Sequence, residues 1–275
     1  MPTLVSPVLS LLHRGPFLVN DTLGLVGTHF LEMTFKKLLR RSIVAVGTLA
    51  TLGLQGKAEA KPSNAPPLGV AIVTGGGRGI GAACSEALAA KGYGVVIAYR
   101  SDDSSADRVC RRIGEAGGKA CAVRCDIGVE EDVVKLFSFA DSAFGVETPL
   151  TVLVNNAGVM GKQTSNLSDC TEHGADDLLE LMRTNVAGPL MAIREAEKRM
   201  STVHGGIGGA IVQISSGSAY IGAPLLYAAS KGALNSLTIG LVAPLARQNI
   251  RINTVRRSAV HDQIVWPRRG KVDAR

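Results

Sequence analysis

The chain has 275 residues, of which 46% are hydrophobic, 4% aromatic and 19% charged, and it contains 32 glycines. This composition excludes a disordered, collagen-like or disulfide-stapled chain, and the length suits one large domain. The net charge of +7 comes from the two ends, because residues 67–255 carry seventeen Lys/Arg against eighteen acids. Without a basic stripe on the body of the protein, nucleic acid is not an expected partner.

Residues 1–66 are predicted to be an extension that precedes the domain. Within 33–60, Arg40 and Arg41 stand before an apolar run of about 13 residues, and a small-x-small sequence follows at 58–60. This order resembles a twin-arginine export signal, which leaves two interpretations: export to the periplasm, or a cytoplasmic protein with an unstructured extension. The run is too short for a stable membrane span, which needs roughly 20 residues. The prolines of 62–67 favour a linker.

Short apolar runs alternate with longer amphipathic stretches across residues 67–255, the predicted domain. We expect strands at 70–74, 95–99, 120–124, 151–155, 210–214 and 250–255. We expect helices at 79–91, 106–116, 130–143, 176–200 and 227–247. Such alternation predicts a single-domain α/β fold of Rossmann type, in which helices cover both faces of a doubly wound parallel sheet.

A glycine-rich turn joins the first strand to the first helix and is the candidate dinucleotide site. Glycines let the backbone turn sharply and approach a pyrophosphate, and the free N–H groups at a helix start stabilise its charge. The cofactor-binding candidates of this turn are Thr74, Gly75, Arg78, Gly79, Ile80 and Gly81.

The end of the second strand is expected to contact the adenosine ribose of the cofactor. Arg100 stands there, where an acid would bind the 2′-hydroxyl of NAD(H). Together with Arg78 it supplies two cations for a 2′-phosphate, so NADP(H) is the favoured cofactor. Asp102 and Asp103 follow closely, which leaves use of NAD(H) possible.

Tyr227 and Lys231 are one helical turn apart at the start of the last predicted helix. A phenol with its ordinary pKa near 10 exchanges protons poorly at neutral pH unless its anion is stabilised. An ammonium one turn away stabilises that anion, and the tyrosine can then act as a general acid or base.

Residues 67–255 resemble the short-chain dehydrogenase/reductase family through several motifs in the family's order. The glycine turn and the Tyr227/Lys231 pair match, and so does Asn185 in the helix before the fifth strand. Further matches are Asp126-Ile127 after the third strand, Asn155-Asn156-Ala157-Gly158 after the fourth, and Ser215-Ser216 at the end of the fifth.

The resemblance implies hydride transfer between nicotinamide and a small alcohol or ketone. It implies that Tyr227 is the acid/base, that Lys231 assists it, that Ser216 positions the substrate oxygen and that Asn185 holds a relay water. It also implies that Asp126, Ile127, Asn156, Ala157 and Gly158 contact the cofactor, together with Tyr227 and Lys231. A homodimer through the helices at 185–200 and 227–247 is expected on the same ground.

The remaining chemistry-bearing residues predict neither a metal site nor a disulfide. The five histidines are scattered and form no ligand cluster, so no metal is expected. The five cysteines show no paired spacing and are predicted to be free thiols.

The sequence departs from the family pattern in two places. Ser216 and Tyr227 are eleven positions apart, about two fewer than is usual in the family, so Ser215 or Ser218 is an alternative for the serine role. After Val255 the chain reads Arg256-Arg257-Ser258 in place of the family's Pro-Gly turn, and 256–275 is predicted to be a basic tail outside the family pattern. A domain truncated before its last strand is therefore expected. The alternative function is an inactive remnant that only binds dinucleotide or self-associates through its exposed sixth strand.

Overall fold

The computed structural model describes residues 66–161 and 174–257. The predicted export signal, Cys170 and residues 258–275 of the predicted tail lie outside these residues, whereas Arg256 and Arg257 form the end of the last strand. Six parallel strands form one sheet in the order β3-β2-β1-β4-β5-β6. The strands are β1 (Val70–Thr74), β2 (Gly94–Tyr99), β3 (Lys119–Arg124), β4 (Leu150–Asn155), β5 (Gly209–Ser216) and β6 (Ile250–Arg257). The six predicted strands and the Rossmann-type topology are confirmed.

The predicted helices are confirmed, and the structure adds a π-helical turn and two short helices that the sequence did not predict. The helices are α3 (Gly79–Ala90), α4 (Asp103–Glu115), α5 (Glu130–Ala140), α7 (Gly174–Met182), η3 (Arg183–Ala187), α8 (Gly188–Met200), η4 (Thr202–His204), α9 (Ser218–Ile221) and α10 (Leu225–Ala246). The expected helical stretch at 176–200 is helical throughout, and η3 is a π-helical turn within it that joins α7 to α8. Such turns are rare and are frequent at functional sites. The four-residue α9 is too short to produce a periodic pattern, so the sequence did not reveal it.

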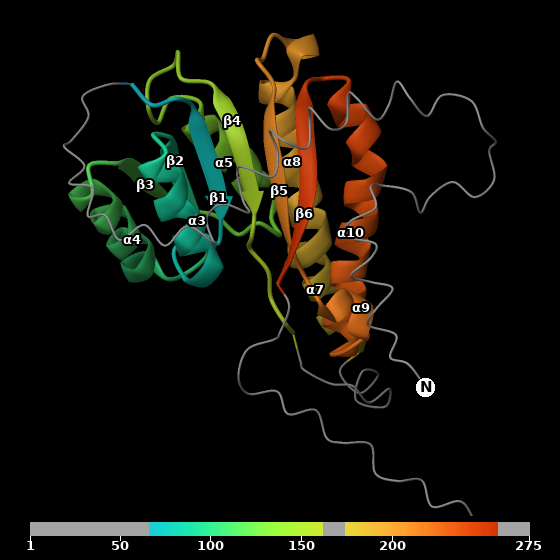
Figure 1. Ribbon diagram of the computed structural model, residues 1–275. Helices are drawn as coiled ribbons and strands as arrows, with labels where there is room; N and C mark the ends of the chain where they lie inside the picture. Colours follow the sequence, from blue (N-terminus) through green and yellow to red (C-terminus); the bar gives the residue numbers. More distant parts are fainter. Residues whose placement is uncertain (1–65, 162–173, 258–275) are drawn as a thin grey trace, which may run out of the picture. The chain divides into compact units, whose positions relative to one another are not determined.

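Helices cover the sheet on two faces, as Figure 1 shows. On one face, α3 and α4 pack Ala89 and Val109 against Val95 and Ile97 of β2. On the other face, α5, α8 and α10 bury a larger cluster that includes Phe137. Strands β1 and β2 are buried on both faces because they lie in the middle of the sheet, whereas β3 is partly exposed along its length.

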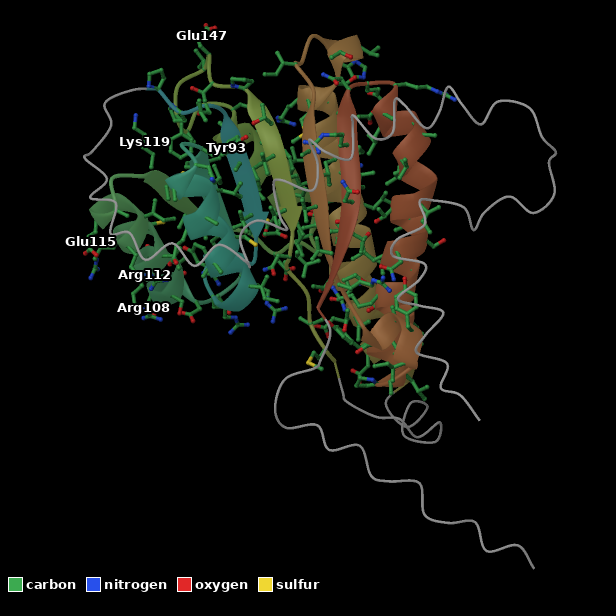
Figure 2. All side chains as sticks on the ribbon, viewed as in Figure 1. Tyr93, Arg108, Arg112, Glu115, Lys119 and Glu147 are labelled. Carbon is green, nitrogen blue, oxygen red and sulfur yellow. The ribbon has the colours of Figure 1, made fainter. Side chains whose placement is uncertain are left out.

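Helix α4 illustrates how the sequence period places its residues. Its buried stripe contains Ala106, Val109 and Ile113. Figure 2 shows Arg108, Arg112 and Glu115 on its outer side, where Arg112 pairs with Glu86 of α3 at 2.6 Å. No helix within the described ranges is long and apolar enough to cross a membrane. The four described cysteines, Cys84, Cys110, Cys121 and Cys125, are free thiols as predicted.

Candidate active site

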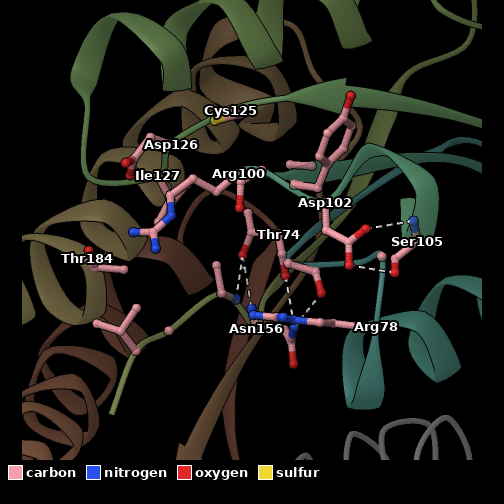
Figure 3. Close-up of a pocket in the computed structure, with 18 residues that line it drawn as sticks. Thr74, Arg78, Arg100, Asp102, Ser105, Cys125, Asp126, Ile127, Asn156 and Thr184 are labelled. Carbon is pink, nitrogen blue, oxygen red and sulfur yellow. Dashed lines mark hydrogen bonds between the residues drawn. The ribbon is translucent and has the colours of Figure 1, made fainter. Parts of the chain in front are cut away.

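A cavity of about 260 Å³ opens at the carboxyl ends of strands β1 to β4. Chain order reverses there, since β1 pairs with β2 on one side and with β4 on the other. In open parallel sheets this switch point is where ligands bind. Figure 3 shows the lining side chains, which come from the glycine turn and from the segments after β2, β3 and β4.

The glycine turn is tied to the segment after β4 by a buried hydroxyl and a side-chain amide. Thr74 Oγ1 accepts hydrogen bonds from the backbone N–H groups of Asn156 and Ala157, both at 3.0 Å. Asn156 Nδ2 donates to the carbonyls of Thr74 and Gly75, again at 3.0 Å. These four bonds connect the ends of β1 and β4 across the switch point, so the two segments form one rigid wall of the cavity.

The turn leaves no room for side chains where it passes over Asn156. A Cβ on Gly81 would contact the Gly75 carbonyl oxygen and would lie 2.5 Å from Asn156 Nδ2. Gly75 and Gly79 have φ of +63° and +53°, a backbone conformation that favours glycine. Beyond Gly79 the space is open, with no atom within 4 Å of a Cβ built there. Arg78 and Ile80 flank Gly79 and are exposed. A tight turn at the start of a twelve-residue helix, with open space in front, fits a pyrophosphate.

The rim of the cavity carries both sequence-predicted arginines. Arg78 and Arg100 line it from the glycine turn and from the end of β2. Asp102 lines it as well, but its carboxylate caps α4: Oδ1 accepts from the Ser105 N–H at 3.0 Å and Oδ2 from the Ser105 hydroxyl at 2.6 Å. The two hydrogen bonds from Ser105 lower the pKa of Asp102, and a hydrogen bond from the Ser104 hydroxyl lowers it further. Desolvation raises the pKa of Tyr99, and a hydrogen bond to Asp103 raises it further. The carboxylates of Asp102 and Asp103 therefore both have hydrogen-bond partners within the protein.

The segment after β3 supplies the far wall. Asp126 and the buried Ile127 line the cavity together with Thr184 of η3. Asp126 Oδ1 accepts from the Gly128 N–H at 2.9 Å, which fixes the carboxylate in the loop before α5. Thr184 and Cys125 are lining residues that the sequence analysis missed, since neither belongs to a recognisable motif.

Tyr227 and Lys231 lie in the first two turns of α10. Lys231 is only 4% exposed, and its Nζ is 5.7 Å from the centre of the Tyr227 ring. Nζ donates to the carbonyl of Ile214 at 2.8 Å, which anchors the lysine to β5. Burial lowers the pKa of Lys231 to about 8. Within the described ranges the Tyr227 side chain has no hydrogen-bond partner, so its hydroxyl is available to an external group.

Gly158 connects the cavity to this pair. It lines the cavity, and a Cβ there would lie 3.5 Å from Lys231 Nζ and 3.2 Å from Asn185 Oδ1. Asn185 is fully buried in η3. Its amide exchanges hydrogen bonds with the Val159 backbone, both at 2.8 Å, and donates to the Ser230 hydroxyl at 3.0 Å. Asn185 thus joins the segment after β4 to α10.

The three candidate serines occupy different environments. Ser216 is partly exposed at the end of β5, and its Oγ accepts the Ser218 N–H at 3.1 Å, which leaves its hydroxyl proton free to donate. Ser215 is buried and faces the Lys231 carbonyl at 3.5 Å. Because successive residues of a strand face opposite sides, only one of the two can face a given group. Ser218 begins α9, and its N–H holds Ser216.

Comparison with known proteins agrees with this geometry. The short chain dehydrogenase family matches residues 69–272. The chain is 41% identical over 202 residues to an uncharacterized oxidoreductase, YgfF, of Escherichia coli K12, which covers 72% of this chain and 78% of that protein. The chain belongs to the short-chain dehydrogenase/reductase family.

Solved members of the family superimpose on this short-chain dehydrogenase/reductase. A dehydrogenase/reductase from Sinorhizobium meliloti 1021 has a TM-score of 0.62 at 34% identity, covering 69% of this chain and 71% of that one. A short chain dehydrogenase from Burkholderia cenocepacia J2315, solved in complex with NADP, has a TM-score of 0.61 at 34% identity, covering 70% and 75%. The protein is therefore an NAD(P)-dependent oxidoreductase, and the cradle around Gly81 fits such a cofactor.

Proposed function

We propose that this short-chain dehydrogenase/reductase interconverts a small ketone and its alcohol with NADP(H), using Tyr227 as general acid and base. The observation that carries the proposal is the buried Lys231 ammonium beside the Tyr227 ring, with Lys231 Nζ close to Gly158, a residue that lines the cavity. An ammonium out of water interacts more strongly with a phenolate than a solvated one, so this pair is suited to proton transfer.

The cofactor would be held by residues of the cavity. The glycine turn of Thr74, Gly75, Gly79, Ile80 and Gly81 offers N–H groups to the pyrophosphate, and Asn156, Ala157 and Gly158 form the opposite wall. Asp126 and Ile127 would border the adenine. When bound, the nicotinamide supplies a hydride to the carbonyl carbon or takes one from the alcohol carbon.

The chain's own residues would manage the proton and the substrate oxygen. In reduction, Tyr227 gives its hydroxyl proton to the carbonyl oxygen, and the Lys231 ammonium stabilises the phenolate that remains. Ser216 donates its free hydroxyl proton as a hydrogen bond to the same oxygen. Asn185 acts as a positioning residue, because its bonds to Val159 and Ser230 hold Gly158 and the first turns of α10 together. In oxidation the proton moves the opposite way.

A carbonyl panel tests the activity. Purified full-length chain is mixed with NADPH and a range of ketones and aldehydes, and loss of NADPH absorbance is followed. Turnover that Ser216→Ala reduces, while the Kd of NADPH stays unchanged, is the expected result. A protein that binds NADPH with micromolar Kd and turns over no carbonyl or alcohol would contradict the proposed activity. That result would support the alternative, an inactive protein that only binds the dinucleotide.

The proposed preference for NADP(H) is supported by the two rim arginines and by the engagement of Asp102 in capping α4. A 2′-phosphate gains charge-assisted hydrogen bonds from guanidinium groups that a 2′-hydroxyl does not gain. We expect Arg78→Ala/Arg100→Ala to weaken NADPH binding by about 10- to 100-fold and NADH binding by less than about threefold. Arg247→Ala, an exposed arginine at the other end of α10, is the control and should change neither Kd. Equal losses for both cofactors would contradict the preference.

A homodimer through α8 and α10 is part of the proposal. Both helices expose large apolar side chains, among them Leu190, Ile239 and Val242, and Ile239 is 69% exposed. Exposed apolar groups of this kind are common at interfaces between subunits. Sedimentation velocity should give a dimer that Ile239→Glu/Val242→Glu converts to monomer. A wild-type monomer at all concentrations would contradict it.

A further inference from the structure

The part of the chain that builds the proposed catalytic end is free of acidic residues. Residues 198–261 contain no Asp or Glu, and this stretch includes β5, α9, α10 and β6. Its basic residues within these elements are Lys231, Arg251, Arg256 and Arg257. The segment that holds Ser216 and Tyr227 is thus positively charged, whereas residues 67–255 as a whole are nearly neutral. Such a bias favours a negatively charged group at this end of the sheet.

The register of the sheet brings one of these cations to the proposed site. In the parallel pair of β5 and β6, Ser215 is opposite Arg256, one residue before Ser216. Neighbouring strands are about 4.8 Å apart, and residues paired in register point to the same face. Ser215 faces α10 through the Lys231 carbonyl. The Arg256 side chain therefore leaves β6 on the face of the sheet that α10 covers, next to the end of β5 that carries Ser216.

Tyr220 of α9 holds the Arg256 guanidinium in place. The guanidinium carbon is 4.5 Å from the centre of the Tyr220 ring, which is a cation–π contact. Both side chains are exposed, Tyr220 at 67%, and α9 begins two residues after Ser216. In the described ranges Arg256 forms no ion pair, although α7, which packs on α10, carries Asp176, Asp177 and Glu180. A stacked guanidinium keeps its in-plane N–H groups open, and these match two oxygens of a carboxylate or phosphate.

We infer that Arg256, stacked on Tyr220, is an anion subsite of the active site, and that the substrate bears a carboxylate or phosphate a few bonds from the carbon that is oxidised or reduced. This inference rests on the proposed function, in which the substrate oxygen faces Tyr227; the anionic group of the same substrate would bind Arg256. Arg256 would set specificity and orient the substrate, and it would take no part in proton transfer.

Matched substrates test the subsite. The enzyme is assayed with NADPH and 2-oxopentanoate or 4-oxopentanoate, each against its neutral methyl ester, and with hydroxyacetone phosphate as the phosphate arm. We expect kcat/KM at least about tenfold higher for one of the anions than for its neutral counterpart. Arg256→Gln should raise the KM of that anion by about 10- to 100-fold, change its kcat by less than about threefold and leave the esters unaffected. The anion that shows the higher kcat/KM and the loss with Arg256→Gln, oxo acid or phosphate, identifies the group that the subsite binds.

Variants and a binding measurement separate this role from a structural one. Arg256→Lys should recover part of the affinity, Tyr220→Phe should match wild type, and Tyr220→Leu should weaken anion binding. Arg247→Gln is the control for loss of one positive charge. Calorimetric titration of the anion into the protein with NADP⁺ bound should give heat that Arg256→Gln abolishes. Equal kcat/KM for anion and ester, or an Arg256→Gln loss shared by the esters or by NADPH affinity, would overturn the subsite. Absence of turnover with every carbonyl would contradict the proposed function instead, and the titration would still decide the subsite.

Discussion

The two halves of the domain use different means to build their parts of the site. Around β1 to β4, the cavity is shaped by the backbone: Thr74 and Asn156 tie two strand ends together, and Gly81 leaves no space for a side chain. Around β5 and β6, single side chains project from the ends of strands and from α10. Lys231 reaches back to the Ile214 carbonyl, and Arg256 extends to Tyr220.

The difference indicates how the two halves should respond to substitution. A wall made by backbone atoms tolerates changes of many side chains but not an added Cβ where the backbone segments meet. A site made by projecting side chains loses one function with each of them and keeps its fold. Substitutions where backbone segments meet in the first half should therefore change cofactor binding and stability together, and those of projecting side chains in the second half should change turnover or substrate binding while the fold is kept.

Tyr227→Phe gives the largest effect that we expect. The substitution removes one oxygen from a partly exposed side chain, so the fold and the cavity remain intact. We expect kcat to fall about 10³-fold because the general acid is lost, with the Kd of NADPH changed by less than about twofold. Stopped-flow assays and fluorescence titration measure the two quantities. A Tyr227→Phe enzyme with more than a tenth of wild-type kcat would assign the proton transfer to another group.

Gly81→Ala tests the backbone-built half. The new Cβ would press on the Gly75 carbonyl and on Asn156 Nδ2, so the turn must shift. We expect NADPH affinity to drop by about 30-fold and the free energy of unfolding to fall by about 1–3 kcal/mol. Gly114→Ala, in α4 with no atom within 4 Å of its Cβ, is the matched control and should be neutral or stabilising by up to about 1 kcal/mol. Identical behaviour of the two variants would refute the close approach.

Lys231 makes turnover depend on pH in the alkaline range. Because burial lowers the pKa of Lys231 to about 8, the ammonium that stabilises the phenolate is lost as pH rises through this value. We expect kcat for ketone reduction to fall roughly tenfold per pH unit above that point. Lys231→Arg keeps its charge and should move the decline to higher pH, even if kcat is lower. A decline at the same pH in Lys231→Arg would show that another group titrates.

The same shift has a consequence for stability. The folded-state pKa of Lys231 lies below its ordinary value of 10.5, so the fold carries the full cost of a buried ammonium below about pH 8. Between pH 8 and 10.5 the folded protein binds fewer protons than the unfolded chain, and the free energy of unfolding rises with pH. The difference in Tm between wild type and Lys231→Met should therefore shrink over this range. A constant difference would contradict the shift.

Asp102→Ala should have the smallest effect. The exposed carboxylate caps α4 through Ser105, and its loss should lower Tm by roughly 2 °C. The ratio of NADPH to NADH affinity should change by less than about threefold, and Asp102→Ser should restore the Tm. A large gain of NADPH preference would show that Asp102 repels the 2′-phosphate rather than serving only as a cap.

Much of this arrangement was predictable from local patterns, and particular residues show where such patterns stop. The strands were recognisable because β1 and β2 are apolar throughout, and the glycine turn was recognisable from its place between strand and helix. The π-turn η3 was not, since its residues have ordinary helical character. Nor did the sequence separate Ser215 from Ser216, because that choice depends on the strand's orientation against α10.

The amino-acid sequence alone determined the alternation of strands and helices, the turn that suits a dinucleotide, and the phenol and ammonium one turn apart. These follow from periodicity and from chemistry between residues a few positions apart. Tertiary structure decided that Asp102 caps α4 and that Lys231 is buried. It also decided that Arg256, which pairs with Ser215 in the sheet, stacks on Tyr220. Each of these depends on strand register and on packing between segments distant in the chain, which the local order of residues does not specify.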